Sequence, residues 1–371
     1  MCFENHDVFF SEEKPGLTLF LAVLFEPCRQ PNVEMRRINL PGDRFDAWFQ
    51  MRLPLAARQD RVDLLHLPAN AAPAWCPVPF VLTVHDLIPL KLPGELPPRE
   101  TRAFRRGLLR GLRSAAHIIT VSNSTREELR HDFGVPLHKT TVIPWAPDTG
   151  VLAHAGQEFD ALQPARIRAK YELGRCWLLS FSGSTARKNA LGVLTGFARA
   201  ATHLPRETQL VLVGCEPAAY RACLTAEAER LGIGAQCRVL GFAPHDDVPA
   251  LLRGARGLLI PSRYEGFGLP ILDAFASGVP VLTSSVSSMP EVAGDAAVYC
   301  DPDDPGSIAA GIERLLDTAT AARLVQRGRR RLSQFSWERT ARAMCAVYEM
   351  CLKEAAAPAH IGAAACEGCV P

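Results

Sequence analysis

The sequence predicts an α/β protein made of two Rossmann-like, doubly wound domains. The chain has 371 residues, which is long enough for two domains of ordinary size. Short apolar runs alternate with helical stretches, and this alternation is interrupted by one polar segment before it begins again. Since such domains bind ligands at the carboxyl ends of their parallel strands, we expect a site in a cleft between the two domains.

The N-terminal domain is expected over residues 1–155. An apolar run over 16–25 is too short to span a bilayer and follows two acids, so it favours a buried strand or helix over a signal peptide. Ser124 or Thr125 is the expected N-cap of the second predicted helix. The buried strands should be residues 62–66, 80–85, 117–121 and 141–144, and the helices residues 98–116 and 125–132.

The second domain is expected over residues 170–335, after a polar linker at 148–168. Ser336 is placed to cap a last helix over 336–355, which Trp337 can anchor, and the Ala-rich residues 356–371 are expected to be disordered. The strands of this domain should be 177–181, 208–213, 237–240, 257–260 and 279–282, and its helices 190–203, 218–231, 246–254 and 269–277.

Composition narrows the class of partner. The formal net charge is only +2, so no nucleic acid or other polyanion is implied. The twelve cysteines are scattered without zinc-site spacing and indicate reduced thiols in a cytoplasm. An NAD-dependent dehydrogenase is not favoured, because no Gly-x-Gly-x-x-Gly follows an early strand.

The segment 263–282 carries the strongest functional signal. Glu265 lies on a glycine-rich turn, and Asp273 follows eight positions later on the predicted helix. Amides at a helix start bind phosphate, and neighbouring carboxylates can accept hydrogen bonds from sugar hydroxyls. The alternative is an amphipathic helix with solvated acids, but it does not explain why Gly266, Gly268 and Pro270 cluster there. The segment predicts a site for a sugar attached to a diphosphate.

Two further loops follow predicted strands. In the loop 181–189, Gly183 allows close backbone approach, and Arg187 and Lys188 supply positive charge for a diphosphate leaving group. A solvated pair of cations at a helix start is the alternative, although it opposes the helix dipole. His85 and Asp86 follow the strand 80–85 and should face the cleft, where His85 could otherwise simply cap the next turn.

The Glu-Gly-Phe-Gly-Leu-Pro context at 265–270 resembles the donor-site signature of retaining GT-B glycosyltransferases of family 4, also called group 1, which includes bacterial mannosyltransferases. That signature has two glutamates separated by seven residues, and here Asp273 replaces the second. The resemblance implies catalytic roles for Glu265 and His85. It further implies diphosphate binding by Gly183, Arg187, Lys188, Gly268 and Leu269, sugar binding by Glu265, Gly266 and Phe267, and ribose or base binding by Asp273, Val239 and Leu240.

The activity implied is retaining transfer of a hexose, with mannose as the best guess, from GDP-mannose or a UDP-sugar. The acceptor would be a saccharide or a lipid-linked sugar in surface polysaccharide biosynthesis. No cofactor is expected, and no metal either, because Arg187 and Lys188 can offset the diphosphate charge and no suitably placed Asp-x-Asp occurs. A catalytically weak partner subunit and a non-hydrolysing sugar-nucleotide epimerase remain as alternatives on the same fold.

Two regions of the sequence concern acceptor binding and the place of the protein in the cell. The Arg-rich helix 98–116 could contact an anionic membrane, placing a cytoplasmic protein at the inner face, or its leucines could face its own core. Relatives begin with a strand and a glycine-rich loop, whereas residues 1–15 contain no glycine and the first strong match lies near 32–41. We therefore expect this element to be missing or diverged, and donor binding to survive better than transfer. The last helix is implied to cross back onto the first domain.

Overall fold

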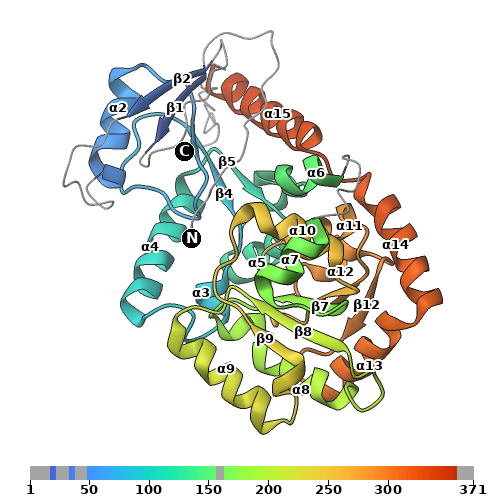
Figure 1. Cartoon of the computed structure of the whole chain (residues 1–371). Coiled ribbons are helices and arrows are strands. Elements are labelled where there is room, and N and C mark those ends of the chain that lie inside the picture. The colour runs from blue at the N-terminus through green and yellow to red at the C-terminus, as the bar shows by residue number, and fades with distance from the viewer. Residues whose placement is uncertain (1–16, 22–32, 38–47, 156–162, 357–371) are drawn as a thin grey trace, which may run out of the picture.

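The computed structural model describes residues 17–21, 33–37, 48–155 and 163–356 and consists of two parallel-sheet α/β domains (Figure 1). Residues 1–15, where the N-terminal element was predicted to be missing or diverged, lie outside the described residues, as does the tail from 357. In the first domain a four-stranded sheet has the order β3-β4-β5-β6, with strands Leu65–Leu67, Phe80–Val84, His117–Thr120 and Thr140–Val142. A separate parallel pair is formed by β1 (Leu17–Leu21) and β2 (Val33–Arg37).

The helices of the first domain connect these strands and cover the sheet. A π-helical turn at Trp48–Arg52 runs directly into α2. Leu108 and Leu112 of α4 pack with Leu82 and Ile118 of the sheet, so the apolar face of the Arg-rich helix is buried in its own domain. The helices are α2 (Leu53–Gln59), α3 (Ile88–Lys91), α4 (Pro98–Ser114) and α5 (Asn123–Phe133), with a 3₁₀ turn at Leu137–Lys139.

The second domain is built on a six-stranded parallel sheet of order β12-β11-β10-β7-β8-β9. Chain order therefore reverses direction between β7 and β10, which pair directly at Leu179 and Leu258. Open α/β sheets bind ligands outside the carboxyl ends of the strands at such a switch point. The strands are Cys176–Phe181 (β7), Thr208–Val213 (β8), Cys237–Val239 (β9), Gly257–Ile260 (β10), Val281–Ser284 (β11) and Ala297–Cys300 (β12).

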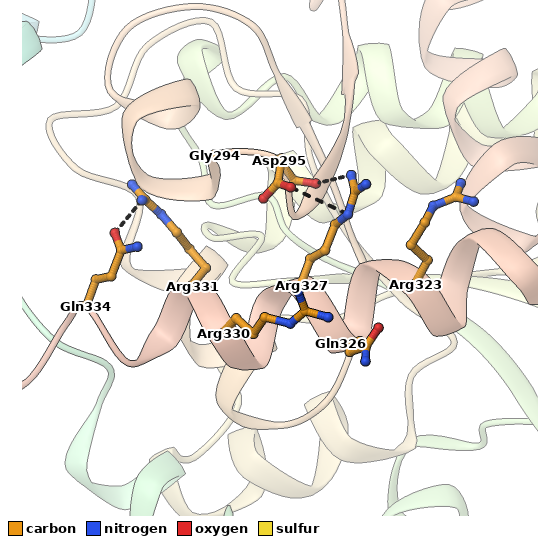
Figure 2. A pocket seen from close by; sticks show the side chains of 8 residues that line it. All are labelled: Gly294, Asp295, Arg323, Gln326, Arg327, Arg330, Arg331 and Gln334. Carbon is orange, nitrogen blue, oxygen red and sulfur yellow. Dashed lines mark hydrogen bonds and ion pairs between the residues drawn. The ribbon is translucent and has the colours of Figure 1, made fainter.

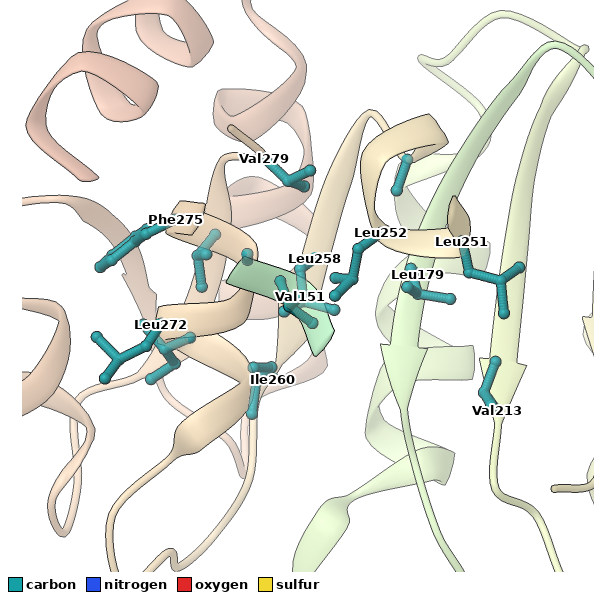
Figure 3. Close-up of a cluster of buried hydrophobic side chains, with 14 of the residues drawn as sticks. Val151, Leu179, Val213, Leu251, Leu252, Leu258, Ile260, Leu272, Phe275 and Val279 are labelled. Carbon is teal, nitrogen blue, oxygen red and sulfur yellow. The ribbon is translucent and has the colours of Figure 1, made fainter. Parts of the chain in front are cut away.

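Helices cover both faces of this sheet and form two cores. Leu179 and Leu258 belong to a core with Leu272 of α11 (Figure 3), whereas Leu178 points to the opposite face and packs with Phe197 of α8. The helices are α7 (Gln163–Tyr171), α8 (Ala190–Ala200), α9 (Ala218–Arg230), α10 (Val248–Gly254), α11 (Leu269–Ala276), α12 (Met289–Ala293), α13 (Pro305–Leu316) and α14 (Thr318–Leu332). Short 3₁₀ turns lie at Ala186–Lys188, Gly234–Gln236 and His245–Asp247.

The last helix, α15 (Trp337–Ala356), leaves the second domain and packs on the first (Figure 1). Val347 and Cys351 join Val81, Ile119 and Ile143 in a small core. Tyr348 adds a hydrogen bond of 2.7 Å between its hydroxyl and His66 Nδ1. At the start of the helix the indole of Trp337 donates to the Pro147 carbonyl at 2.8 Å. These contacts tie the two domains together at their connection.

Several predicted boundaries were wrong. The N-cap of α5 is Ser122, whose hydroxyl accepts the Thr125 N–H, so neither Ser124 nor Thr125 caps the helix. Strand β11 begins at Val281 rather than at 279, because Pro280 lacks an N–H for the ladder. The segment 148–168, predicted as a polar linker, contains α6 (Thr149–Ala155) and the first part of α7. The side chain of Asp148 accepts the Gly150 N–H at the start of α6.

Candidate functional site

A buried charged cluster lies at the switch point of the second domain. Arg187 and Lys188 follow β7, and Glu265 follows β10. The Glu265 carboxylate lies 2.7 Å from Arg187 Nη1 through one oxygen and 2.7 Å from Lys188 Nζ through the other. The side chains of Arg187, Lys188 and Glu265 are 16%, 18% and 9% exposed. The structure thus brings together the three charged residues predicted for the diphosphate and the sugar.

The loop after β7 is shaped by two residues in the left-handed region. Gly183 has φ +53°, where a side chain is disfavoured, and Asn189 has φ +61°. The buried amide of Asn189 donates to the carbonyls of Pro261 at 3.0 Å and Pro302 at 2.7 Å. This side chain therefore locks the Arg187 loop to the loop that follows β10.

The loop that carries Glu265 is held by two serines, Ser287 and Ser288, which were not predicted as site residues. Gly268 ends this loop with φ +100° and is the N-cap of α11. The Ser287 hydroxyl donates to the Glu265 carbonyl at 2.6 Å, and the Ser288 hydroxyl lies 2.8 Å from that carbonyl and 2.9 Å from the carbonyl of Phe267. The run of serines directly after β11 was the only local signal for this role.

Glu265 is ionised in this setting. Burial by itself would raise the pKa of Glu265, but the positive charges of Lys188 and Arg187 outweigh it, and the pKa is lowered. A carboxylate held in this way accepts hydrogen bonds and balances charge, and it is a poor proton donor near neutral pH.

His85 lies where the first domain meets the loop that carries Glu265. The backbone N–H of His85 donates to Asn70 Oδ1 at 2.6 Å, and its backbone carbonyl accepts the Thr125 hydroxyl at 3.2 Å. The imidazole packs at 5.0 Å on the ring of Trp145, which in turn lies 6.2 Å from the ring of Phe267. His85, Trp145 and Phe267 therefore form one aromatic row across the domain contact.

Gly266 is a point of very close approach. A Cβ atom at this position would collide with the His85 carbonyl and would lie 2.8 Å from Asp86 Cβ. Only glycine leaves room for the backbone of the first domain here.

Three contacts between the domains involve acids that the sequence did not reveal. Glu95 Oε1 accepts the backbone N–H of Arg187 at 3.1 Å, and its other oxygen lies 3.8 Å from the guanidinium Nε. The Tyr264 hydroxyl donates to Glu128 at 2.6 Å. Glu291 accepts the N–H groups of Asn123 and Ser124 at the start of α5. The partners are so far apart in sequence that no local pattern marks them.

The predicted ribose and base residues make other contacts in the structure. Asp273 Oδ1 accepts the N–H of Asp148 at 2.8 Å, and burial raises the pKa of Asp273 to about 7. The N–H of Leu240 donates to the Leu212 carbonyl, and its own carbonyl accepts the Cys215 N–H. Val239 ends the edge strand β9. Their roles toward a nucleotide stay predictions, as do those of Gly268 and Leu269 at the start of α11.

Outside this site, a hollow of about 560 Å³ lies along α14 (Figure 2). Two of its arginines donate hydrogen bonds to carbonyls of α12 and of the loop that follows it. Arg327 donates to the Asp295 carbonyl at 3.0 Å, and Arg331 Nε donates to the Val292 carbonyl at 3.0 Å. Its lining contains none of the predicted site residues and consists of Gly294, Asp295, Arg323, Gln326, Arg327, Arg330, Arg331 and Gln334.

The described part of the chain has neither a cluster of metal ligands nor a helix suited to span a membrane. In residues 17–21, 33–37, 48–155 and 163–356, no three His, Cys, Asp or Glu side chains are grouped so as to hold a metal ion. Within these same ranges no helix combines the length and apolarity that crossing a membrane requires.

The two parallel-sheet α/β domains have the GT-B fold of known glycosyltransferases. Solved structures of this class resemble the chain over most of its length. A glycosyltransferase from Rickettsia africae has a TM-score of 0.68 at 17% identity, covering 86% of each chain. Alr3699/HepE from Anabaena, solved in complex with UDP-glucose, has a TM-score of 0.66 at 17% identity, also covering 86% of each chain. At these identities the likeness concerns the fold.

Sequence comparison then gives the family. The model of glycosyl transferases group 1 matches residues 167–331, and that of glycosyltransferase family 4 matches residues 7–150. O-antigen chain mannosyltransferase B of Escherichia coli is 34% identical over 268 residues, covering 70% of this chain and 67% of the relative. MMP alpha-(1->4)-mannosyltransferase of Mycolicibacterium hassiacum is 30% identical over 295 residues, covering 75% and 67%. The chain belongs to glycosyltransferase family 4, and its match to the family extends further toward the N-terminus than the predicted start near 32–41.

Proposed function

We propose that this glycosyltransferase transfers a hexose from a nucleotide diphosphate sugar with retention of anomeric configuration. The observation that carries the proposal is the meeting of Arg187, Lys188 and Glu265 at the switch point between β7 and β10. Two cations beside a backbone turn suit a diphosphate, and a fixed carboxylate suits the hydroxyls of the sugar.

The proposed chemistry uses charge stabilisation at the leaving group. As the bond between the anomeric carbon and the phosphate oxygen breaks, Arg187 and Lys188 offset the charge that develops on the diphosphate. The acceptor oxygen forms its bond to the anomeric carbon on the same face, and its proton passes to the departing phosphate oxygen. Because Glu265 is ionised, its part is to orient the sugar and the two cations rather than to transfer a proton.

Relatives support the choice of substrates. The two relatives named above are mannosyltransferases, and one of them acts on an O-antigen chain. The HepE structure, by contrast, holds UDP-glucose. We propose GDP-mannose or a UDP-sugar as the donor, without a metal, and a saccharide or lipid-linked acceptor in surface polysaccharide biosynthesis.

We place this reaction in the cytoplasm, with α4 facing the inner surface of the membrane. Leu108 and Leu112 of α4 are buried against their own sheet, whereas its arginines are exposed. Any membrane contact through α4 is therefore electrostatic and should weaken as salt rises.

A ligand screen tests the proposal. We expect GDP-mannose or a UDP-sugar to stabilise the protein, since a ligand at 100 times its dissociation constant adds about 2.7 kcal/mol. Replacing Arg187 and Lys188 together by glutamine should abolish this gain while circular dichroism shows an intact fold. Arg230→Gln, which removes an exposed partner of Glu227, is the matched control and should bind like the wild type. Undiminished binding by the double variant would place the diphosphate elsewhere.

A further inference from the structure

Glu95 supplies a carboxylate from the first domain to the place where a donor phosphate is expected. It lies in the loop between α3 and α4, and its side chain is only 8% exposed. One oxygen accepts the Arg187 N–H at 3.1 Å, and the other lies 3.8 Å from the guanidinium. An anion that binds a backbone N–H and an arginine at the same turn is bound as a phosphate oxygen would be.

The charges of the cluster are already balanced without a ligand. Arg187 and Lys188 are opposed by Glu265 and Glu95. Asp86 is a third acid near the cluster. Burial raises the pKa of Asp86, which the charge of Arg187 lowers and the charge of Glu265 raises. A nucleotide diphosphate would bring at least two more negative charges into this poorly solvated place. Binding is more favourable if one of the acids withdraws from the cluster.

Glu95 is the acid that can withdraw. Glu265 is fixed within its own domain, because Ser287 and Ser288 hold its carbonyl and both cations hold its side chain. The loop of Glu95 belongs to the other domain. Next to it, Gly94 has φ +94°, and a Cβ atom at this glycine would meet no other atom within 4 Å, so the chain beside Glu95 is not closely packed at this point.

We propose that Glu95 is a gating residue for the donor: its carboxylate occupies the phosphate position at the 186–188 turn, and donor binding displaces it. The inference rests on the proposed function, since it requires that the diphosphate binds at Arg187. It adds that the Glu95 carboxylate must leave the phosphate position before the donor binds, and that this competition lowers nucleotide affinity.

Glu95→Gln tests the proposal with little risk to the fold. Glutamine keeps an oxygen for the Arg187 N–H but removes the negative charge that competes with phosphate. We expect UDP or GDP, without sugar, to bind the full-length variant about tenfold more tightly by calorimetry, while the nucleotide-free variant melts at a lower temperature. Glu100→Gln, an exposed acid on α4, is the matched control and should change neither quantity.

The outcomes separate the two proposals. Weaker or equal nucleotide binding by Glu95→Gln would overturn the gating role and would make Glu95 a structural partner of Arg187. If, in that case, Arg187→Gln still abolishes binding, the proposed donor site survives. If neither nucleotide binds the wild type or Glu95→Gln, both proposals fail. Tighter binding by Glu95→Gln that is lost when Arg187→Gln is added supports both.

Discussion

At the scale of single residues, Glu265 combines burial with a full negative charge. Its two oxygens contact Arg187 and Lys188 at 2.7 Å each, and these cations hold its pKa below the ordinary range despite burial. The charge is thus available to position a sugar and cannot be removed without freeing two cations.

Replacing Glu265 by glutamine should therefore separate turnover from nucleotide binding. A charged hydrogen bond is worth about 1.5–3 kcal/mol, so we expect turnover to fall roughly 10- to 150-fold. Binding of UDP or GDP should not weaken, because Arg187 and Lys188 lose a competing anion. Steady-state kinetics and calorimetry check the two parts. Glu227→Gln, in an exposed ion pair with Arg230, is the control. Wild-type turnover in the Glu265 variant would refute the role.

Asp273 should make stability depend on pH in an unusual direction. Burial raises its pKa from 3.8 to about 7, so between these values the folded chain keeps a proton that the unfolded chain has lost. The resulting penalty is absent below pH 4, grows as pH rises to 7, and stays constant above. It amounts to roughly 4 kcal/mol at most.

The variant Asp273→Asn should remove this penalty and keep an acceptor for the Asp148 N–H. Relative to the wild type, we expect its urea midpoint to be much higher at pH 8 and only slightly higher at pH 4.5. A difference that does not vary with pH would show that the folded carboxyl titrates normally.

Residues of the site were predictable only where chemistry and local pattern coincide. Glu265, Arg187 and Lys188 lie in short glycine-containing loops after buried strands, and the structure places all three in one cluster. Glu95 lies in the segment Pro-Gly-Glu-Leu-Pro, whose composition is typical of an exposed turn. Nothing in this segment predicts a contact with Arg187, which is 92 positions away. An acid whose partner lies in the other domain cannot be predicted from the spacing of residues along the sequence.

At the scale of elements, apolar runs located the strands well, but their ends depend on individual backbone groups. Strands 208–213 and 257–260 have the predicted bounds, whereas β11 is displaced because Pro280 has no N–H. The helices α6 and α7 were missed because their polar sequence lacks a clear apolar stripe. Tertiary contacts explain their formation, including Val151 of α6 in the same core as Leu252 (Figure 3).

The loop between β10 and α11 depends on Ser288 of a neighbouring element. Its hydroxyl lies within hydrogen-bonding distance of the carbonyls of Glu265 and Phe267, and Ser288 is fully buried. We expect Ser288→Ala to cost about 1–3 kcal/mol of stability, since buried carbonyls lose a donor, and to lower turnover as the loop loosens. Ser333→Ala, which loses one exposed hydrogen bond to Arg330, should change little in thermal melts or kinetics. Equal behaviour of the two variants would mean that Ser287 alone braces the loop.

At the scale of the whole molecule, charged and polar groups join the two domains around the site, in addition to the aromatic row of His85, Trp145 and Phe267. Glu291 accepts N–H groups at the start of α5, where a negative charge also favours the helix dipole. Tyr264 binds Glu128, and Glu95 binds Arg187. The sequence predicted two domains and a last helix between them, but the contacts that set their relative position arise from loops of both domains.

Gly266 also lies at the contact between the domains and makes their approach sensitive to a single added methyl group. An alanine Cβ at this position would collide with the His85 carbonyl and approach Asp86 Cβ to 2.8 Å. Neither obstacle is the flexible end of a side chain, so the domains must separate slightly or the loop must shift, at a cost of about 1–3 kcal/mol. We expect Gly266→Ala to raise the radius of gyration measured by small-angle X-ray scattering and to lower turnover at least tenfold. Nucleotide affinity should change less, because Arg187 and Lys188 remain in place. Gly174→Ala, where the added Cβ would make only ordinary contacts, is the control. Unchanged turnover and dimensions in Gly266→Ala would show that the close approach of His85 to this loop is not needed for the reaction.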